Sequence, residues 1–261
     1  MSTELAQLRR ETGKGRHEAA PSLWQVLGDL RLRRSMTILL VLTIAQQLSG
    51  INVVFYYSSD TFTKAGVAAV MGTLLASVVN ALATVLAVVM IESCGRRILL
   101  ILGAGSMLAS QVLLTVFLIL KEDATGSTKE TLNWLSIAMV LVFVTGFEIG
   151  LGAIPWMIGS DLFPDKPRAT AMSFGALCNW LANLTVGLGF LPMQSALGAY
   201  SFVPFAVVLA VTFVFILLVV PETKNKSVEQ VLDELNGESS TDSGQGNAIE
   251  RKLLLDGDDD D

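Results

Sequence analysis

Six polar side chains stand close together within one apolar stretch of this sequence, between Ile44 and Tyr57. They are Gln46, Gln47, Ser49, Asn52, Tyr56 and Tyr57. Side-chain amides find no hydrogen-bond partner in hydrocarbon, so burying several of them is costly unless protein, water or a ligand satisfies them. The stretch therefore predicts a polar site at the middle depth of a membrane protein.

Gly50 lies at the centre of this stretch, and we expect the helix to break there. On an unbroken helix Gln47 and Asn52 point about 140° away from each other. A local break brings both amides to one cavity. Irregular backbone at membrane depth is tolerated only where it is buried in protein or lines a cavity.

Later apolar segments contribute further polar residues. Asn80 stands in one of them, and Asn179 and Asn183 share a helix face in another because they are four residues apart. Glu148 lies near the middle of a third segment, where a bare carboxylate costs about 2.5–3.5 kcal/mol on insertion scales. We expect Glu148 to face water, to have a partner or to be protonated.

Trp156 follows Glu148 and Gly152 at i, i+4 and i+8, which places a carboxylate and an aromatic face on one stripe of a continuous helix. An ordinary tryptophan of the membrane interface is an equally good interpretation of Trp156. A single asparagine in a span also often serves only as an interhelical contact.

Taken together, these residues favour a neutral, hydroxyl-rich ligand kept in a shared polar chamber. Amides hydrogen-bond to hydroxyls as donor and acceptor, and an aromatic face covers the C–H face of a sugar ring. The apolar spans contain no Lys or Arg, which argues against an anionic substrate. The predicted substrate-binding residues are Gln46, Gln47, Asn52, Asn80, Glu148, Trp156 and Asn179.

The composition indicates an all-α membrane protein. Of the 261 residues, 52% are hydrophobic and only 16% are charged, whereas a soluble domain carries about 25% charged residues. Six apolar blocks each reach the length of about 20 residues that spans a bilayer. The predicted spans are Met36–Tyr57, Val70–Ile91, Ile98–Leu120, Leu132–Gly159, Ala169–Leu191 and Tyr200–Val220.

The positive charges predict that both termini lie in the cytosol. With the N-terminus inside, the cytosolic segments hold 15 of the 18 Lys and Arg residues, as the positive-inside rule requires. The chain then divides into a basic, amphipathic cytosolic segment (1–35), a six-helix transmembrane bundle (36–220) and an acidic, largely disordered cytosolic tail (221–261). The first 35 residues show no signal-peptide pattern, so we expect insertion to depend on the first span.

Two cytosolic loops repeat a pattern of acid and arginine at helix ends. Glu92, Arg96 and Arg97 lie between the second and third spans, and Asp161 and Arg168 lie between the fourth and fifth. One interpretation is a set of surface ion pairs that contribute little. The other is a latch whose ion pairs form in one conformation and break in another.

Helix-breaking residues recur when the six spans are divided into two triplets. The first span of the second triplet contains Gly146, Gly150, Gly152 and Pro155, as the first span of the chain contains its own break. Interrupted segments at corresponding positions of inverted repeats indicate a transporter's site. For Gly146 and Gly150 alone, close helix packing is the better interpretation, whereas Pro155 near Glu148 favours a functional break.

The sequence excludes several classes of function. It contains a single histidine, and we find no Gly-rich phosphate loop, no metal-ligand cluster and no Ser/His/Asp set, so we expect neither an enzyme nor a cofactor. The net charge of −6 arises from the tail, which carries −8 from Pro221 onward. No feature indicates nucleic-acid binding.

Six motifs in order closely resemble the sugar porter family of the major facilitator superfamily, which includes the facilitative hexose transporters. The motifs are QQLSGINVVFYYS (46–58), ESCGRR (92–97), GFEIGLGAIPW (146–156), SDLFPDKPR (160–168), NW (179–180) and PETKNKS (221–227). The resemblance implies that the seven predicted substrate-binding residues surround or support a sugar. It also implies that the loop acids and arginines form an inward-side salt-bridge network, which Asp161 weakens because the family usually has Glu there.

Tyr56 and Tyr57 end the first span on its outer side. They fit ordinary interface aromatics, and the resemblance implies that they form an outer gate. The dileucine-like pattern from Glu250 to Leu255 fits an endocytic sorting signal, so we expect a plasma or endosomal membrane.

The resemblance covers only the C-terminal half of the family, spans seven to twelve. Alternating access rocks one half against the other around the site, so we weigh three interpretations. The chain is a truncated product, which we favour, or a half that pairs with itself or with another half, or a non-transporting sugar sensor or regulatory partner. The expected partners are a small neutral sugar, the lipid bilayer and a second transporter half.

Overall fold

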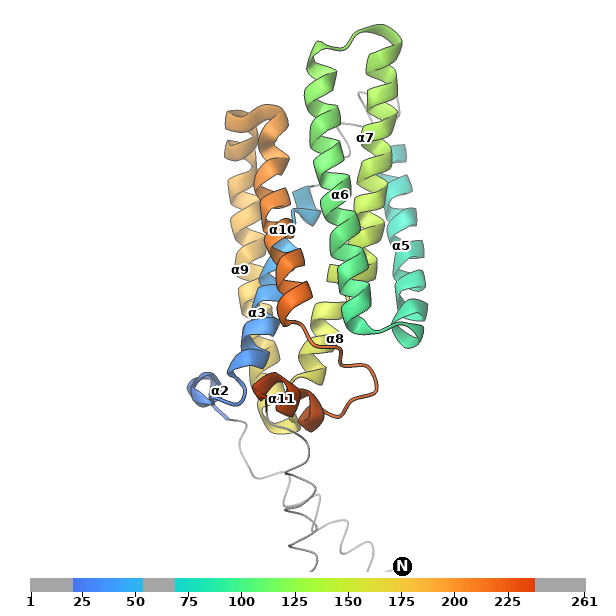
Figure 1. Cartoon of the computed structure of the whole chain (residues 1–261). Coiled ribbons are helices and arrows are strands. Elements are labelled where there is room, and N and C mark those ends of the chain that lie inside the picture. The colour runs from blue at the N-terminus through green and yellow to red at the C-terminus, as the bar shows by residue number, and fades with distance from the viewer. Residues whose placement is uncertain (1–20, 54–68, 238–261) are drawn as a thin grey trace, which may run out of the picture.

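The computed structural model describes residues 21–53 and 69–237, and every regular element in these ranges is a helix (Figure 1). In chain order these elements are α2 (Leu23–Gly28), α3 (Arg33–Leu48), α5 (Ala69–Ser93), α6 (Arg96–Asp123), α7 (Gly126–Phe147), the π-helix η1 (Glu148–Gly152), α8 (Ile154–Asp161), α9 (Asp165–Leu197), the 3-10 helix η2 (Gly198–Phe202), α10 (Val203–Val219) and α11 (Val228–Asn236).

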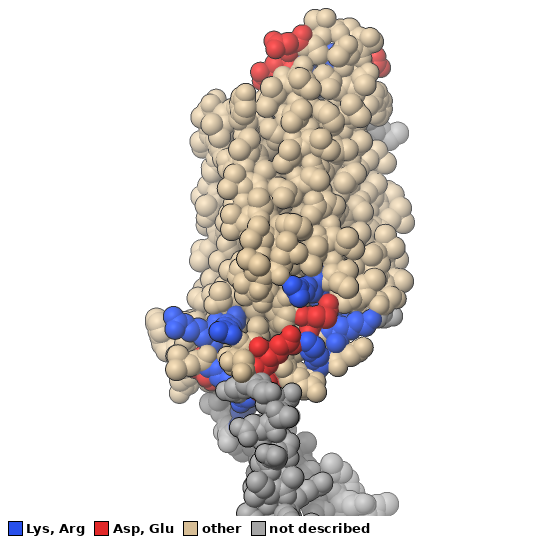
Figure 2. Space-filling view, in the orientation of Figure 1, with Lys and Arg blue, Asp and Glu red and all other residues tan. Residues whose placement is uncertain are grey.

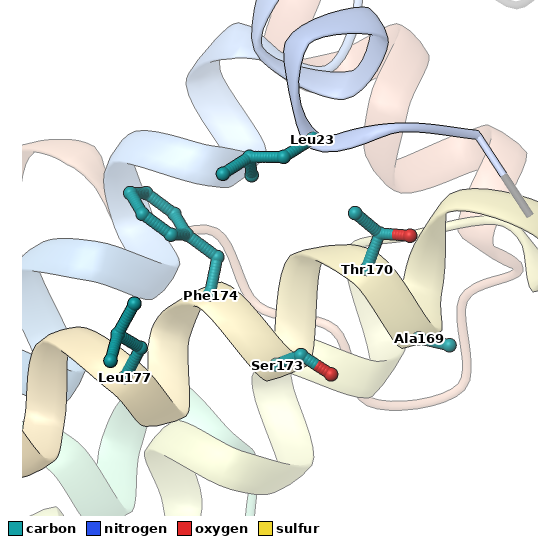
Figure 3. A pocket seen from close by; sticks show the side chains of 6 residues that line it. All are labelled: Leu23, Ala169, Thr170, Ser173, Phe174 and Leu177. Atoms are coloured by element: carbon teal, nitrogen blue, oxygen red, sulfur yellow. The ribbon is translucent and has the colours of Figure 1, made fainter.

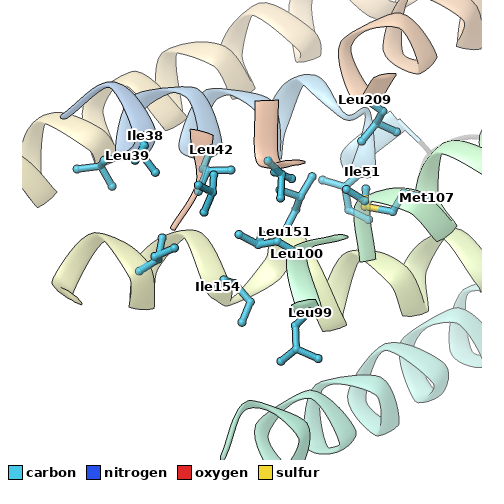
Figure 4. Packing of buried hydrophobic residues seen from close by; sticks show 14 of the residues in the cluster. Ile38, Leu39, Leu42, Ile51, Leu99, Leu100, Met107, Leu151, Ile154 and Leu209 are labelled. Atoms are coloured by element: carbon cyan, nitrogen blue, oxygen red, sulfur yellow. The ribbon is translucent and has the colours of Figure 1, made fainter. Parts of the chain in front are cut away.

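The long helices run side by side in one bundle (Figure 1). Helices α6 and α7 form an antiparallel hairpin with α5 beside α7, while α9 packs against α3 and α10 packs against α6 and α3. The short helices α2, α8 and α11 gather at one end. The core lies where α3, α6, η1 and α10 meet, around completely buried residues such as Leu42, Leu100 and Leu151 (Figure 4).

Four segments of the described residues are long and apolar enough to cross a membrane. They are Arg33–Val53, Arg96–Asp123, Gly126–Asp161 and Asp165–Val219, the last of which contains both α9 and α10. The apolar stretch Ser77–Ile91 of α5 is shorter. Charged side chains gather near the two ends of the visible face and leave a broad uncharged band between them (Figure 2). The prediction of an all-helical, membrane-embedded chain is confirmed.

The break predicted in the fourth span is present. Helix α7 passes into the π-helix η1 at Glu148, a turn follows at Ala153, and α8 begins at Ile154 with Pro155 in its first turn. Proline fits there because the first turn needs no N–H donor from it. The helix that carries Glu148, Gly152 and Trp156 is not continuous, because η1 and the turn at Ala153 interrupt it. Glu148 and Gly152 share a face as expected, since a Cβ atom added to Gly152 would lie 3.3 Å from Glu148 Oε2.

Small residues set the distance between α6 and the end of α7. A Cβ atom added to Gly103 would lie 2.5 Å from Gly150 Cα and 2.6 Å from the Gly146 carbonyl oxygen. Larger residues at these positions would force the two helices apart. The packing interpretation of Gly146 and Gly150 is therefore confirmed.

Candidate functional site

The site begins at the break in the first span. Helix α3 ends at Leu48, Gly50 adopts a φ of +84°, and the backbone is helical again at Ile51. A side chain at Gly50 would be strained at this φ, and its Cβ would lie 2.9 Å from the Phe205 ring. Asn52 Nδ2 donates to Gln47 Oε1 at 3.0 Å. The prediction that a break at Gly50 brings these two amides together is confirmed.

Five amide side chains form one hydrogen-bonded group, which we call the amide cluster: Gln46, Gln47, Asn52, Asn179 and Asn183. Gln47 Nε2 donates to Asn179 Oδ1 at 3.2 Å, and Asn183 Nδ2 donates to Gln47 Oε1 at 3.0 Å. Asn179 Nδ2 in turn donates to Gln46 Oε1 at 2.7 Å and to the Thr43 carbonyl at 2.7 Å. The cluster joins α3 to α9 in the apolar bundle.

Gln46 connects the amide cluster to the broken helix. Its Nε2 donates to the carbonyl oxygens of Leu151 at 2.6 Å and of Gly152 at 2.7 Å. Both carbonyls lie in η1, where the backbone departs from the α-helical pattern. The two interrupted segments predicted from the sequence therefore meet through one side chain.

The members of the amide cluster differ in burial. Gln46 is 4% exposed and Asn179 is 3% exposed, and all their side-chain nitrogens and oxygens have partners within the protein. Gln47, Asn52 and Asn183 are only partly buried. An amide in this second group has donor or acceptor capacity left for a ligand hydroxyl, whereas the buried pair serves as a support.

Asn80 belongs to a second group, which we call the carboxylate cluster: Asn80, Thr84 and Glu148. Asn80 Nδ2 donates to Glu148 Oε1 at 2.6 Å, and Thr84 Oγ1 donates to Glu148 Oε2 at 3.0 Å. Each carboxylate oxygen therefore has a donor from α5, which offsets the cost of placing Glu148 in an apolar segment. This is the partner that Glu148 was expected to have.

Six of the seven predicted substrate-binding residues thus fall into two groups, and both groups contact η1. Gln46, Gln47, Asn52 and Asn179 satisfy one another in large part, rather than opening only onto a common chamber. Trp156 lies on α8, is partly buried and belongs to neither cluster. Thr84 and Asn183 complete the clusters, and the signal for both is their spacing of four residues from Asn80 and Asn179.

A separate pocket of about 430 Å³ lies between α2 and α9 (Figure 3). Its lining consists of Leu23, Ala169, Thr170, Ser173, Phe174 and Leu177. The side chains of Leu23 and Phe174 close one side of the pocket, and the hydroxyls of Thr170 and Ser173 lie along α9. No residue of either cluster lines this pocket.

One ion pair joins the two charged loops. Arg96 Nε lies 3.7 Å from Asp161 Oδ2, while Arg168 pairs with Asp165 of its own loop at 2.9 Å. Arg97 Nη2 donates to the Leu217 carbonyl at 2.6 Å. Of the other predicted gate and latch residues, Tyr56, Tyr57 and the side chain of Glu92 lie outside the described residues.

Glu222 is the central acid of this end of the molecule, and the predicted latch residues did not include it. Its two carboxylate oxygens accept the backbone N–H groups of Arg96 at 2.9 Å and Arg97 at 3.2 Å, so it caps the N-terminus of α6. A Cβ at Gly95 would collide with this carboxylate. Thr223 Oγ1 donates to Asp161 Oδ2 at 3.0 Å. The signal was the PETKNKS motif, of which both residues are part.

Comparisons with known proteins find related sequences over most of this chain. A family model described as "Sugar (and other) transporter" matches residues 1–235. Facilitated glucose transporter member 4 of solute carrier family 2 from Mus musculus is 41% identical over 232 residues, which cover 88% of this chain and 45% of that protein. Member 3 from Oryctolagus cuniculus is 36% identical over 257 residues, with 97% and 51% covered.

Two solved structures of sugar symporters are also similar. The proton:xylose symporter XylE bound to 6-bromo-6-deoxy-D-glucose matches with a TM-score of 0.65 and 29% identity, over 77% of this chain and 42% of that chain. A D-xylose-proton symporter matches with a TM-score of 0.63 and 27% identity, over 85% and 49%. The chain spans about half the length of the curated relatives it matches.

Proposed function

Because the chain belongs to the sugar transporter family, we propose that it supplies the C-terminal half of a hexose transporter and that its amide cluster recognises the sugar. The observation that supports this proposal is the difference in burial between the members of the amide cluster. Gln46 and Asn179 hold α3, α9 and η1 together, and the partly exposed Gln47, Asn52 and Asn183 offer hydrogen bonds to sugar hydroxyls.

In this proposal Glu148, Asn80 and Trp156 also contact the sugar. The carboxylate cluster accepts hydroxyl hydrogen bonds, and Trp156 provides an apolar face for the ring. A sugar held between the clusters touches both interrupted segments, so its binding is coupled to the backbone geometry at Gly50 and at η1.

The proposed topology has six spans and two cytosolic termini. Helices α3, α5, α6, α9 and α10 each supply one span, and α7 continues through η1 and α8 as another. The charged end that holds Arg96, Asp161 and Glu222 then faces the cytosol. Tyr56 and Tyr57 take the outer end, and a plasma or endosomal membrane is the proposed location.

The transport cycle in this proposal needs a second half, because alternating access moves one half against the other around the bound sugar. The Arg96–Asp161 pair is the proposed element of the cytosolic latch. At 3.7 Å it is longer than a hydrogen bond, so it opens at little cost.

Equilibrium binding of tritiated D-glucose to the chain in lipid nanodiscs tests the proposal, with L-glucose as the stereochemical control. We expect saturable binding of D-glucose that L-glucose does not displace. Absence of D-glucose binding would contradict the proposed sugar site. A second experiment measures the uptake of tritiated D-glucose into liposomes that contain this chain as their only protein.

The flux result separates a chain that transports by pairing with itself from a chain that does not transport alone. Binding without flux, together with quenching of Trp156 fluorescence by D-glucose, is the outcome for a chain that needs a second half or serves as a sugar sensor. Binding with flux is the outcome for a chain that pairs with a second copy of itself. A variant in which Trp156 is the only remaining tryptophan assigns the quenching to this residue.

A further inference from the structure

Gln111 is a buried amide that the proposed transport function does not use. It lies near the middle of α6 and is 0% exposed. Neither its Nε2 nor its Oε1 has a hydrogen-bond partner from the protein. A buried polar atom without a partner costs its full desolvation penalty, and such atoms are rare in native proteins.

Two other deeply buried amides, Gln46 and Asn179, provide a contrast. The side chains of Gln46 and Asn179 have at least one partner at every nitrogen and oxygen, and they use carbonyls of neighbouring helices to reach this state. The fold is therefore able to satisfy an amide at membrane depth. Gln111 departs from that pattern at both of its polar atoms, which indicates a partner that is not a protein group.

Further polar groups surround this part of the α6–α7 hairpin. Ser110, Thr115 and Ser136 are buried, and each hydroxyl donates to a carbonyl of its own helix, at 2.9, 2.9 and 2.8 Å respectively. Their oxygens keep acceptor capacity after this donation. Asn133 is also buried, with 5% of its surface exposed.

The pairing of the two helices places these groups near one level. Gly103 of α6 packs against Gly146 and Gly150 of α7 and η1, and the hairpin turns between Asp123 and Gly126. In this register Ser136 lies within roughly two helical turns of Gln111 along the hairpin. Met107 lies one turn before Gln111 on α6, and it lies close to α7, since a Cβ atom added to Gly146 would lie 3.3 Å from Met107 Cγ.

We propose that Gln111 binds ordered water beside α6, in the interior of the bundle. Water is the small ligand that both donates and accepts, so one molecule or a short chain satisfies Nε2 and Oε1 and reaches the neighbouring hydroxyl oxygens. A sugar does not fit the observation, because the side chain has no exposed surface. The site is independent of the amide cluster and of transport.

X-ray radiolytic labelling in ¹⁸O-water tests this site in the full chain in lipid nanodiscs. Hydroxyl radicals form from water, so a completely buried methionine is oxidised quickly only when bound water lies beside it. Met107 is 0% exposed and supplies the probe. We expect rapid ¹⁸O incorporation at Met107 in the native chain and loss of this label in Gln111→Leu, whereas Leu114→Met, a change of shape at another buried position of α6, keeps it.

The native measurement decides the proposal even if Gln111→Leu does not fold. Absence of Met107 labelling in the native chain would overturn the proposal. A label that persists in a folded Gln111→Leu chain would overturn it too, because Gln111 would then not hold the water. The unfolding midpoint gives a second criterion, since a dry, unsatisfied Gln111 predicts a higher midpoint for Gln111→Leu, and water bound to Gln111 predicts no such gain.

Discussion

The amide cluster and the carboxylate cluster flank the same π-helical turn but are built in different ways. In the amide cluster, residues from α3 and α9 bond to one another and to the backbone of η1, so each side chain has several partners. In the carboxylate cluster, one acid from η1 receives two donors from α5 alone. The first arrangement fixes three elements together, whereas the second ties one helix to one acid.

This difference has a consequence for movement. Among the described side chains, separating α3 from α9 breaks several linked hydrogen bonds, whereas separating α5 from η1 breaks two. The contact of α5 with η1 is therefore the easier one to release. In the proposed transport cycle, the amide cluster is the fixed side of the sugar site and the carboxylate cluster is the side that adjusts.

The largest effect is expected for Asn179→Ala. This change removes the partner of Gln46 Oε1, of Gln47 Nε2 and of the Thr43 carbonyl. We expect a loss of roughly 3 kcal/mol in the free energy of unfolding, because each buried polar atom left unpaired costs about 1–3 kcal/mol. Unfolding in mixed detergent micelles measures it, and a loss below about 1 kcal/mol would show that the cluster does not support the fold.

Asn80→Ala tests the carboxylate cluster in the same way. It removes the shorter of the two hydrogen bonds to Glu148, at 2.6 Å. Hydrogen bonds to charged groups contribute about 1.5–3 kcal/mol, so we expect a loss of about 2 kcal/mol in unfolding free energy. Thr84→Val is the matched control and should cost less, because Thr84 is exposed. A larger cost for Thr84→Val would contradict the assignment of Asn80 as the main donor.

Asn52→Ala separates support from recognition within the amide cluster. Asn52 is partly exposed and makes one side-chain hydrogen bond, to Gln47. We expect a loss of at most about 1 kcal/mol in unfolding free energy. The rise in unfolding midpoint on adding D-glucose should shrink, since a ligand stabilises the folded state according to its affinity. An undiminished rise would remove Asn52 from the sugar site.

Asp161→Asn should have the smallest effect on stability. The Arg96–Asp161 pair is partly solvent-exposed and 3.7 Å long. Exposed ion pairs contribute about 0–1 kcal/mol, so we expect a change of about 0.5 kcal/mol or less at low salt and none at high salt. Glu222→Gln, which weakens the helix cap of α6, is the comparison variant and should cost more. Equal costs would mean that the ion pair is more than a weak latch.

The sequence predicted the local features of this site because they depend on residues close together in the chain. Gly50 marked the break that unites Gln47 with Asn52, and the i, i+4 spacing placed Asn179 and Asn183 on one face. The small residues of the fourth span similarly indicated its close packing against another helix.

The sequence did not predict which helices would face each other. The sequence analysis grouped Asn80 with the other amides. Because α5 lies beside η1, the Asn80 side chain instead donates a hydrogen bond to Glu148. The sequence also did not predict that a π-helical turn would interrupt the helix between Glu148 and Trp156. Glu222 was missed because it lies far along the chain from the α6 N-terminus, and only the path of the chain after α10 brings it there.

The central claim is that the partly exposed amides of the amide cluster recognise a hexose, and Gln47 tests it most directly because it bonds to Asn52, Asn179 and Asn183. The measurement is the affinity of tritiated D-glucose for native and Gln47→Ala chains in nanodiscs, with equal helix content by circular dichroism. We predict a loss of at least about tenfold, which corresponds to about 1.4 kcal/mol. Unchanged, stereoselective binding by Gln47→Ala would contradict the account.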